Sequence, residues 1–418
     1  MMKHQKGAVT LLYTAMLLIA ILTLSIASYK NVFLQAKRAQ NEITSRQQHW
    51  AAEGGLECAF AVNRSNTGVD LLNQDYSNCT QSSLEFSPNT SGSTFYTVTS
   101  KNVKSEVKKI IKMPKAAGLA AITANADMIL LGNYDVQPNP INKNTVTNRY
   151  ECLSVNYSQK FTFLKDKYNT NAEYHTMKPY DPSIKPANAA NTVYCEADYI
   201  TNITTTETVD REKNTPSEIA QFKKDFLYTS GLDPFKKIFG VARSDFQEIK
   251  SHFDVISNPT NCSAAVNSQI SASKELIWVE GNCDISSINS SNTQGIILVV
   301  QNGLLALGGS AQFNGVLYHF INTTFTPTSS DWSSLGSTAN TSYLRIDESA
   351  SEVGISVDIP SAIIQGSALP QGSLIIDTPN NLALIDGSAT ISFDQLKIDH
   401  PLKTLLKPKW LKGSWHDF

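Results

Sequence analysis

The residues of this chain that could do covalent chemistry are six cysteines, spaced along the sequence as three successive pairs. None lies in a C-x-x-C motif, so zinc binding and thioredoxin-like redox chemistry have no support. An even number of cysteines is typical of exported proteins stabilised by disulfides. We expect sequential bonds because each would close a modest loop, and buried free thiols are the alternative. The expected pairs are Cys58 with Cys79, Cys152 with Cys195, and Cys262 with Cys283.

Patterns of enzyme active sites are missing from the sequence. Its seven histidines are scattered, and none belongs to an H-E-x-x-H pair. No G-x-S-x-G turn, P-loop or G-x-G-x-x-G occurs. Asp284, Asp377 and Asp386 are isolated along the chain, whereas glycan-cleaving enzymes need clustered carboxylates. We therefore expect no enzymatic activity, no cofactor and no metal centre, with a calcium site in the head left open.

The first 29 residues predict an N-terminal helix. Lys3 and Lys6 precede Gly7, and Ala8–Tyr29 follows without a charge. As a helix this apolar run would be about 33 Å long, enough for a hydrocarbon core of about 30 Å. The two lysines predict that the leader stays in the cytoplasm. A cleaved secretory signal and a plain membrane anchor are the alternatives, although the run is long for a signal.

The helical pattern continues beyond the apolar run. Apolar or small residues recur at roughly 3.6-residue spacing, among Lys37, Arg38, Glu42 and Arg46. This predicts an amphipathic stalk that extends the membrane helix by some 30 residues. The recurring residues are Val32, Phe33, Ala36, Ala39, Ile43, Trp50 and Gly54.

These features resemble the PilX-type minor pilins of type IV pili. Gly7 stands between a charged leader and the apolar run, and Gln48–Leu56 resembles the motif that ends the N-terminal helix in that family. Asp233–Gly240 resembles a segment of its longer members. The resemblance implies cleavage between Gly7 and Ala8 by prepilin peptidase, N-terminal methylation, and assembly at an inner-membrane platform with other minor pilins and the major pilin.

Leu12 is a departure from most pilins, which carry glutamate as the fifth residue after the cut. A buried unpaired charge is costly in an apolar environment, and that glutamate is thought to offset the terminal amine of the subunit above. A subunit with Leu12 needs no partner above it. The resemblance therefore implies a subunit that primes assembly and ends at the pilus tip, outside the cell. The alternative is that Leu12 is one more apolar residue of an anchor.

The soluble remainder is expected to be α+β. Its 418-residue length leaves room for a head of more than one domain, and a net charge of −2 with 17% charged residues excludes a strong global field for nucleic acid. Leu84–Met113 predicts strands that pack on the helix as an antiparallel sheet. Its lysines, which include Lys101 and Lys109, are interpreted as a solvated strand face, and a patch for DNA or another anion is the alternative.

A second strand pattern recurs in the remainder of the chain. Asn125–Val136, Asn302–Phe313 and Asn380–Ile391 each have an asparagine, an apolar strand and then a glycine. The pattern aligns Gly132, Gly309 and Gly387 and favours a β-solenoid, with a β-sandwich as the alternative. Between the repeats, the capping pattern at Thr215 predicts a helix that carries Phe222 and Phe226 and ends at Gly231, and a second helix is expected from Ser244.

The C-terminal residues combine basic and aromatic side chains. Such a tail can bind single-stranded DNA by charge and stacking, and the alternative is that its tryptophans pack on the body. The candidate DNA contacts are Lys403, Lys407, Lys409, Trp410 and Lys412. A tip adhesin or a DNA-binding module is therefore the alternative function.

The expected segments are a leader (1–7), a helix (8–60), a pilin-like strand region (61–139), an insertion with helices (140–260), a solenoid-like domain (261–395) and a tail (396–418).

Overall fold

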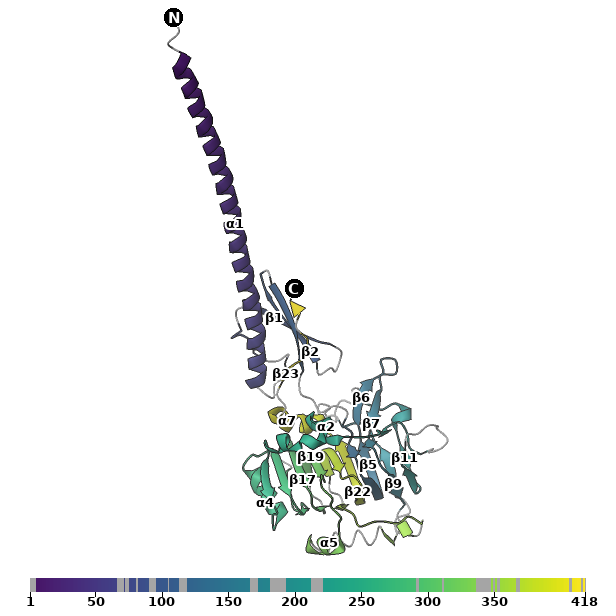
Figure 1. Cartoon of the computed structure of the whole chain (residues 1–418). Coiled ribbons are helices and arrows are strands. Elements are labelled where there is room, and N and C mark those ends of the chain that lie inside the picture. The colour runs from purple at the N-terminus through teal and green to yellow at the C-terminus, as the bar shows by residue number, and fades with distance from the viewer. Residues whose placement is uncertain are drawn as a thin grey trace. The chain divides into compact units, whose positions relative to one another are not determined.

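One unbroken helix forms the N-terminal part of the chain. The computed structural model describes residues 5–65, 71, 75–79, 82–89, 95–103, 105–112, 119–165, 172–180, 193–211, 221–290, 293–309, 312–335, 347–348, 350–351, 354–365, 369–405, 408–414 and 416–417. Helix α1 (Gln5–Ser65) has 61 residues (Figure 1). At about 1.5 Å per residue it is about 92 Å long. It contains no proline, which explains why nothing breaks it. The helix expected over 8–60 is confirmed with slightly wider bounds.

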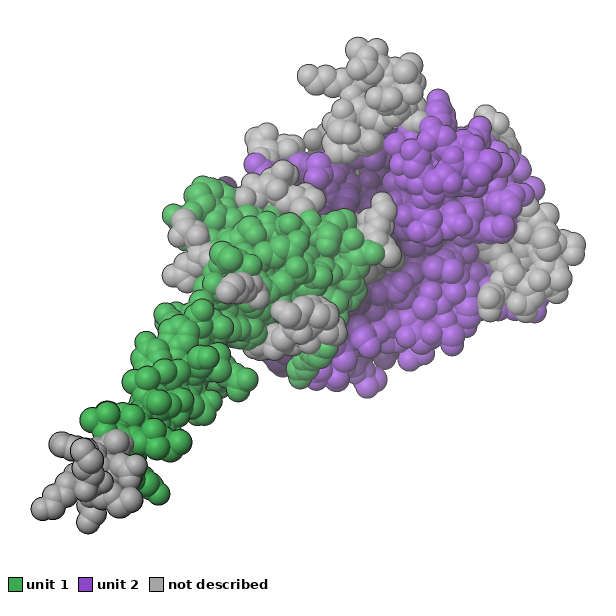
Figure 2. Space-filling model, turned by 90° about the horizontal axis from the view of Figure 1, so that it is seen from above, with its two compact units in different colours: residues 1–113, 407–418 green, residues 114–406 purple. Residues whose placement is uncertain are grey.

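The chain divides into two units, coloured separately in Figure 2. Unit 1 comprises residues 1–113 and 407–418, and unit 2 comprises residues 114–406. Unit 1 combines α1 with an antiparallel sheet in the order β1, β2, β3, with β23 and β24 both pairing with β3. These strands are β1 (Ser83–Pro88), β2 (Phe95–Asn102), β3 (Ser105–Lys112), β23 (Lys409–Trp410) and β24 (His416–Asp417).

Unit 2 contains two ladders of parallel strands. In the first, the strands pair in the order β14 (Asp254–Ser257), β15 (Leu276–Glu280), β17 (Ile296–Gln301), β19 (Gln312–Phe320), β21 (Leu369–Asp377), β4 (Ile122–Ala124), β8 (Val155–Tyr157) and β13 (Phe226–Tyr228). In the second, the order is β16 (Cys283–Asp284), β18 (Leu305–Leu307), β20 (Ala362–Gln365), β22 (Leu382–Phe393), β5 (Asp127–Gln137) and β9 (Phe161–Leu164). The chain as a whole is thus α+β. Its described residues form an antiparallel sheet in unit 1, and a mixed sheet and a separate two-stranded antiparallel sheet in unit 2.

Strand order in these ladders does not follow chain order. The first strands of unit 2, β4 and β5, pair on one side with its last strands, β21 and β22. On the other side they pair with β8 and β9. As a result, unit 2 begins and ends at neighbouring positions in the ladders.

Glycines allow two of these parallel pairs to approach closely. Gly132 in β5 pairs with Gly387 in β22, and Gly372 in β21 pairs with Gly315 in β19. A Cβ on Gly132 would lie 1.9 Å from the Gly387 carbonyl oxygen, and φ at Gly132 is +132°. Only glycine adopts this backbone without strain. The expected match of Gly132 with Gly387 is therefore correct. Gly309, which was expected to align with them, lies instead in a turn after β18.

The remaining elements of unit 2 surround the ladders. Strand β12 (Glu207–Val209) adds antiparallel to β9, β10 (Tyr174–Thr176) pairs with β5 and β11 (Asn202–Ile203), and β6 (Asn139–Lys143) forms a hairpin with β7 (Tyr150–Leu153). Apolar side chains of the ladder strands form one large buried cluster and a second, smaller one that includes Trp332. The helices are η3 (Ala197–Tyr199), α2 (Pro234–Phe239), η4 (Arg243–Asp245), α3 (Phe246–Lys250), α4 (Cys262–Ser271), α5 (Ser329–Leu335) and α7 (Gln395–Leu405).

The three predicted disulfides are present. Cys58–Cys79 ties the end of α1 to the segment that precedes the sheet of unit 1. Cys152–Cys195 links β7 to the segment before η3, and Cys262–Cys283 links α4 to β16. Each bond therefore closes a loop within one unit, as the sequential pattern predicted.

The expected segment boundaries need correction. Region 61–139 was expected to belong to the pilin-like part, but β4 and β5 pair with unit 2. Region 140–260 is not a separate insertion, because β8, β9, β13 and β14 are members of the ladders. The tail 396–418 is divided, since α7 packs within unit 2 and β23 and β24 complete the sheet of unit 1. Strand pairing over long sequence distances decides all three boundaries.

The helix expected between Thr215 and Gly231 is also wrong in its described part. Residues 212–220 lie outside the described residues, residues 221–225 are not helical, and Phe226 begins β13. The reason is tertiary packing: the Phe226 ring lies 5.2 Å from Phe161 and 4.8 Å from Phe222 in the core. The helix expected from Ser244 is found as η4 followed by α3.

Candidate assembly helix and head contacts

Helix α1 leaves its apolar N-terminal surface uncovered. Apolar side chains from Val9 to Leu34 are exposed along the helix, and the space-filling view shows α1 projecting from the rest of unit 1 (Figure 2). This part of α1 is long and apolar enough to cross a membrane. Leu12 is 60% exposed, so the described residues leave most of its side chain uncovered. Gly7 and Ala8 both lie in the first turns of the helix.

The C-terminal turns of α1 pack on the sheet of unit 1 through one face. Ala52, Leu56 and Ala59 are fully buried there, at the i, i+4, i+7 spacing of a helix face. Gly55 lies on the same face, where an added Cβ would lie 1.8 Å from Ser82 Oγ. The small residues of the Gln48–Leu56 motif therefore let the helix and sheet approach closely. Sheet residues Val98, Val107 and Ile111 complete this core.

N-terminal to these turns, the opposite side of α1 carries an apolar and exposed strip. Trp50 is 72% exposed, and it lies about 200° around the helix from Ala52 at about 100° per residue. Val32, Ala36, Ala39 and Ile43 fall within about 60° of the same direction and are also exposed. We call these five residues the apolar stripe. The sheet of unit 1 therefore covers one side of α1 and leaves the apolar stripe available to a partner.

A charged and aromatic cluster holds the helix to the sheet. Lys109 Nζ of β3 lies 2.9 Å from Glu57 Oε1 and 3.7 Å from Glu53 Oε1, both on α1. The same ammonium group lies 5.4 Å from the ring centre of Trp410, whose ring stacks on Phe60 at 4.8 Å. Lys109 is buried, so the interpretation of the β3 lysines as a solvated face is wrong at this position. The sequence signal for this ion pair is the i, i+4 spacing of Glu53 and Glu57 on a helix, together with a strand rich in lysine.

The candidate DNA contacts do not form one continuous set. Trp410 packs on Phe60 within unit 1, while Lys409 and Lys412 are exposed in that unit. Lys403 belongs to α7 of unit 2, and Lys407 lies outside the described residues. One face of the Trp410 ring is thus already occupied by a protein aromatic group. DNA binding by this segment stays a prediction, to be tested by the salt dependence of binding before and after the lysines are replaced by alanine.

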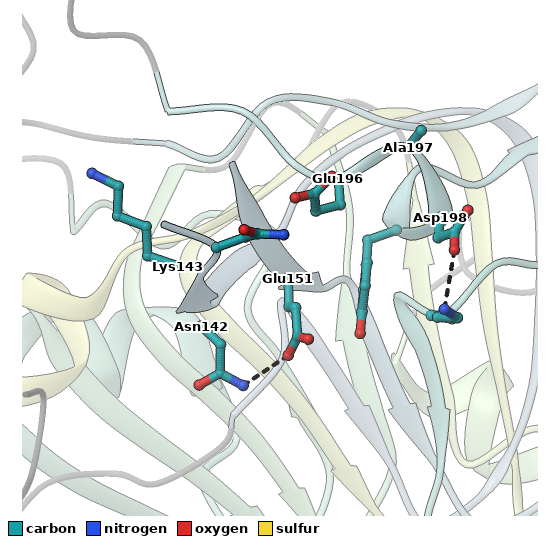
Figure 3. A pocket seen from close by; sticks show the side chains of 9 residues that line it. Asn142, Lys143, Glu151, Glu196, Ala197 and Asp198 are labelled. Atoms are coloured by element: carbon teal, nitrogen blue, oxygen red, sulfur yellow. Dashed lines mark hydrogen bonds and ion pairs between the residues drawn. The ribbon is translucent and has the colours of Figure 1, made fainter. Parts of the chain in front are cut away.

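Unit 2 holds a polar pocket of about 530 Å³ beside the β6–β7 hairpin (Figure 3). Cys152–Cys195 brings the flanking residues Glu151 and Glu196 to this pocket. Glu151 accepts a hydrogen bond from Asn142 Nδ2 at 2.7 Å, and Lys224 pairs with Asp198 at 3.0 Å. Burial and the Glu151 carboxylate raise the pKa of Tyr199, which lines the same pocket. The lining combines hydrogen-bond donors and acceptors with little apolar surface.

Two carboxylates are buried in unit 2. The sequence pattern left Asp377 isolated and gave no signal for Asp225. Asp377 accepts from Arg243 Nη1 at 2.6 Å and from Tyr318 at 2.9 Å. Asp225 accepts from the hydroxyl groups of Ser154, Thr176 and Thr201 at 2.5–2.7 Å. These partners are far apart in sequence, which is why no local pattern revealed them. Within the described residues, no group of three or more His, Cys, Asp or Glu side chains could hold a metal ion.

Comparison with known proteins leaves these features to be interpreted on physical grounds. No protein-family model, no curated protein and no solved structure matches the chain.

Proposed function

We propose that this chain is a minor pilin of a type IV pilus that primes filament assembly and lies at the pilus tip. The observation that carries the proposal is the division of α1: its last turns are covered by the head on one side, while its apolar N-terminal surface and the apolar stripe are exposed. Exposed apolar surface of this extent is unfavourable in water. It suits a helix held first by lipid and later by the helices of neighbouring subunits.

The proposal assigns a role to the N-terminal residues. Prepilin peptidase would cut between Gly7 and Ala8 on the cytoplasmic side of the inner membrane, while both units lie in the periplasm. The helix would then pass from the membrane into the filament through the assembly platform. Leu12 would let this subunit occupy the first position, since it leaves no carboxylate in need of an amine above it.

Unit 2 in this proposal is a short β-solenoid rather than a sandwich. Its support is the parallel pairing of successive strands in two ladders, with stacked glycines at corresponding positions. Parallel pairing requires a crossover between strands, which each coil of a solenoid supplies. A sandwich is built mainly of antiparallel pairs.

Processing and position can be tested with single substitutions. The mature protein isolated from pili should begin at Ala8, and Gly7→Asp should leave the chain uncut and pili reduced. A mature chain that begins near Lys30 would contradict the proposal. Leu12→Glu should disturb assembly because it introduces a carboxylate with no partner above, whereas the control Leu12→Ile should assemble normally. Normal piliation of the Leu12→Glu variant would remove the tip assignment.

A tip adhesin is a second candidate, favoured by the polar pocket of unit 2. Deleting residues 261–418 would not separate the two functions, because β22 supports β5 and β23 and β24 complete the sheet of unit 1. A sharper test replaces pocket residues by isosteres. Loss of surface adhesion with normal pili in a Glu151→Gln and Glu196→Gln variant would favour the adhesin, and unchanged adhesion would count against it.

A further inference from the structure

The charged residues of α1 that lie N-terminal to its contact with the sheet of unit 1 are almost all basic. Between Ala8 and Ala52 the chain has four basic residues, Lys30, Lys37, Arg38 and Arg46, and one acidic residue, Glu42. Glu42 is already paired with Arg46 at 2.7 Å. The remaining three cations form no ion pair within the described residues, although the Lys37 ammonium group lies 5.5 Å from the ring centre of Phe33.

These cations gather on one side of the helix. At about 100° per residue, Lys30, Lys37 and Arg38 fall within about 100° of one another. That side is opposite the apolar stripe, and all three residues are exposed. We call Lys30, Lys37 and Arg38 the basic face. N-terminal to its contact with the sheet of unit 1, α1 therefore has one apolar side and one cationic side that neighbouring molecules can contact.

A second copy of this chain is a poor neighbour for the basic face. Packed helices lie about 8–10 Å apart, which is close to the screening length of about 8 Å at physiological salt. Two parallel copies would place like charges at this separation. Glu42 is the one acidic residue that either copy has between Ala8 and Ala52, and it already pairs with Arg46 of its own helix.

Lipid headgroups are also less suitable than a protein partner. Lys37 lies eight residues beyond Tyr29, the end of the apolar run, which is about 12 Å along the helix. The headgroup layer extends only about 5–8 Å beyond the hydrocarbon core on each side of a bilayer. Lys37 and Arg38 thus lie above the membrane surface, where a neighbouring helix can reach them.

We infer that the assembly partner of α1 is a helix of a different chain that carries carboxylates opposite Lys37 and Arg38, and that copies of this chain do not pair through α1. The inference rests on the proposed role of α1 in assembly. It names the chemistry of the partner and explains why one such subunit would not extend into a filament of its own kind. Partner helices would be selected by charge as well as by apolar packing.

The test uses the full chain as its own probe. Donor- and acceptor-labelled copies are placed in phosphatidylcholine vesicles and their association is followed by energy transfer. Wild type is mixed with wild type, with a Lys37→Glu and Arg38→Glu variant, or with a Lys37→Gln and Arg38→Gln variant. The glutamate variant should associate with wild type about five- to tenfold more tightly than wild type does with itself at about 50 mM salt. The glutamine control should give an intermediate value, and the differences should shrink near about 0.5 M salt.

Two outcomes would overturn the inference. Wild type that associates with itself as tightly as with the glutamate variant would show that α1 needs no acidic partner. A preference that disappears when anionic phosphatidylglycerol is added would show that the basic face contacts lipid instead. Neither result bears on cleavage at Gly7 or on piliation, so the proposed function would stand or fall separately.

Discussion

Lys109 and Glu57 are joined across the helix–sheet contact of unit 1 by an ion pair of 2.9 Å, in which the lysine side chain is 8% exposed and the glutamate side chain 52%. The two partners thus differ in what their loss would leave behind. Without Glu57, the buried ammonium group loses its shortest ion pair and keeps the longer contact to Glu53 and the contact with the Trp410 ring. Without Lys109, the glutamates can turn to water.

This asymmetry predicts unequal effects of two substitutions. Glu57→Gln should destabilise the helix–sheet contact by about 1–2 kcal/mol, whereas Lys109→Met should cost less because it removes the buried charge and keeps the packing. Hydrogen exchange of the β2 and β3 amides in the full chain measures both. Glu42→Gln is the control, since its exposed pair with Arg46 should contribute under about 0.5 kcal/mol. A larger loss for Lys109→Met than for Glu57→Gln would show that the charge itself holds the contact.

Gly55 and Gly54 are neighbours with opposite surroundings. A Cβ on Gly55 would lie 1.8 Å from Ser82 Oγ and 2.6 Å from Ser100 Oγ, while Gly54 is exposed. Gly55→Ala should therefore destabilise unit 1 by about 1–3 kcal/mol through overpacking. Gly54→Ala should stabilise the helix by up to about 1 kcal/mol. Thermal unfolding of the two variants compares them directly, and equal effects would mean that the close helix–sheet approach is unimportant.

Arg243 compensates a buried charge in unit 2. Burial raises the pKa of Asp377 above its ordinary value of 3.8, and Arg243 opposes that shift. Arg243→Met should leave the carboxylate unpaired and cost about 3–5 kcal/mol near neutral pH. The loss should shrink as the pH falls toward the ordinary pKa, because the carboxyl group then becomes neutral. Urea unfolding across pH 4–7 would test this, and a loss independent of pH would indicate that Arg243 acts only through its packing on Phe320.

His319 should make unit 2 sensitive to acid. Its ring is buried, Nε2 lies 2.8 Å from the Gly303 carbonyl oxygen, and burial lowers its pKa from 6.5 to about 4. The unfolded chain binds a proton below pH 6.5 while the folded chain does not. Stability is therefore complete above pH 6.5 and falls between pH 6.5 and about 4, by up to about 3 kcal/mol.

Replacing His319 by glutamine should flatten that part of the stability profile. His252→Gln is the matched control, since His252 is exposed and should leave the profile unchanged. Urea unfolding measured at several pH values compares the three proteins. A His319→Gln variant that loses stability as steeply as wild type over this window would exclude His319 as the cause.

Features that depend on neighbouring residues could be predicted before the structure was known. The uncharged run and its continuing periodicity predicted α1, alternation predicted β2 and β3, and nearby cysteines predicted the three disulfides. Each of these signals lies within a few tens of residues. Helix periodicity and short loop closure can therefore be recognised without knowledge of the rest of the chain.

The contacts between distant segments could not be predicted in this way and are seen in the folded chain. The tertiary structure placed β5 beside β22, took Phe226 out of a predicted helix and into β13, and used Trp410 to complete the core of unit 1. It also buried Lys109 and paired Asp377 with Arg243. Parallel strands and buried charges are stabilised by partners from other parts of the chain. The residues next to a strand or charge therefore do not identify its partner.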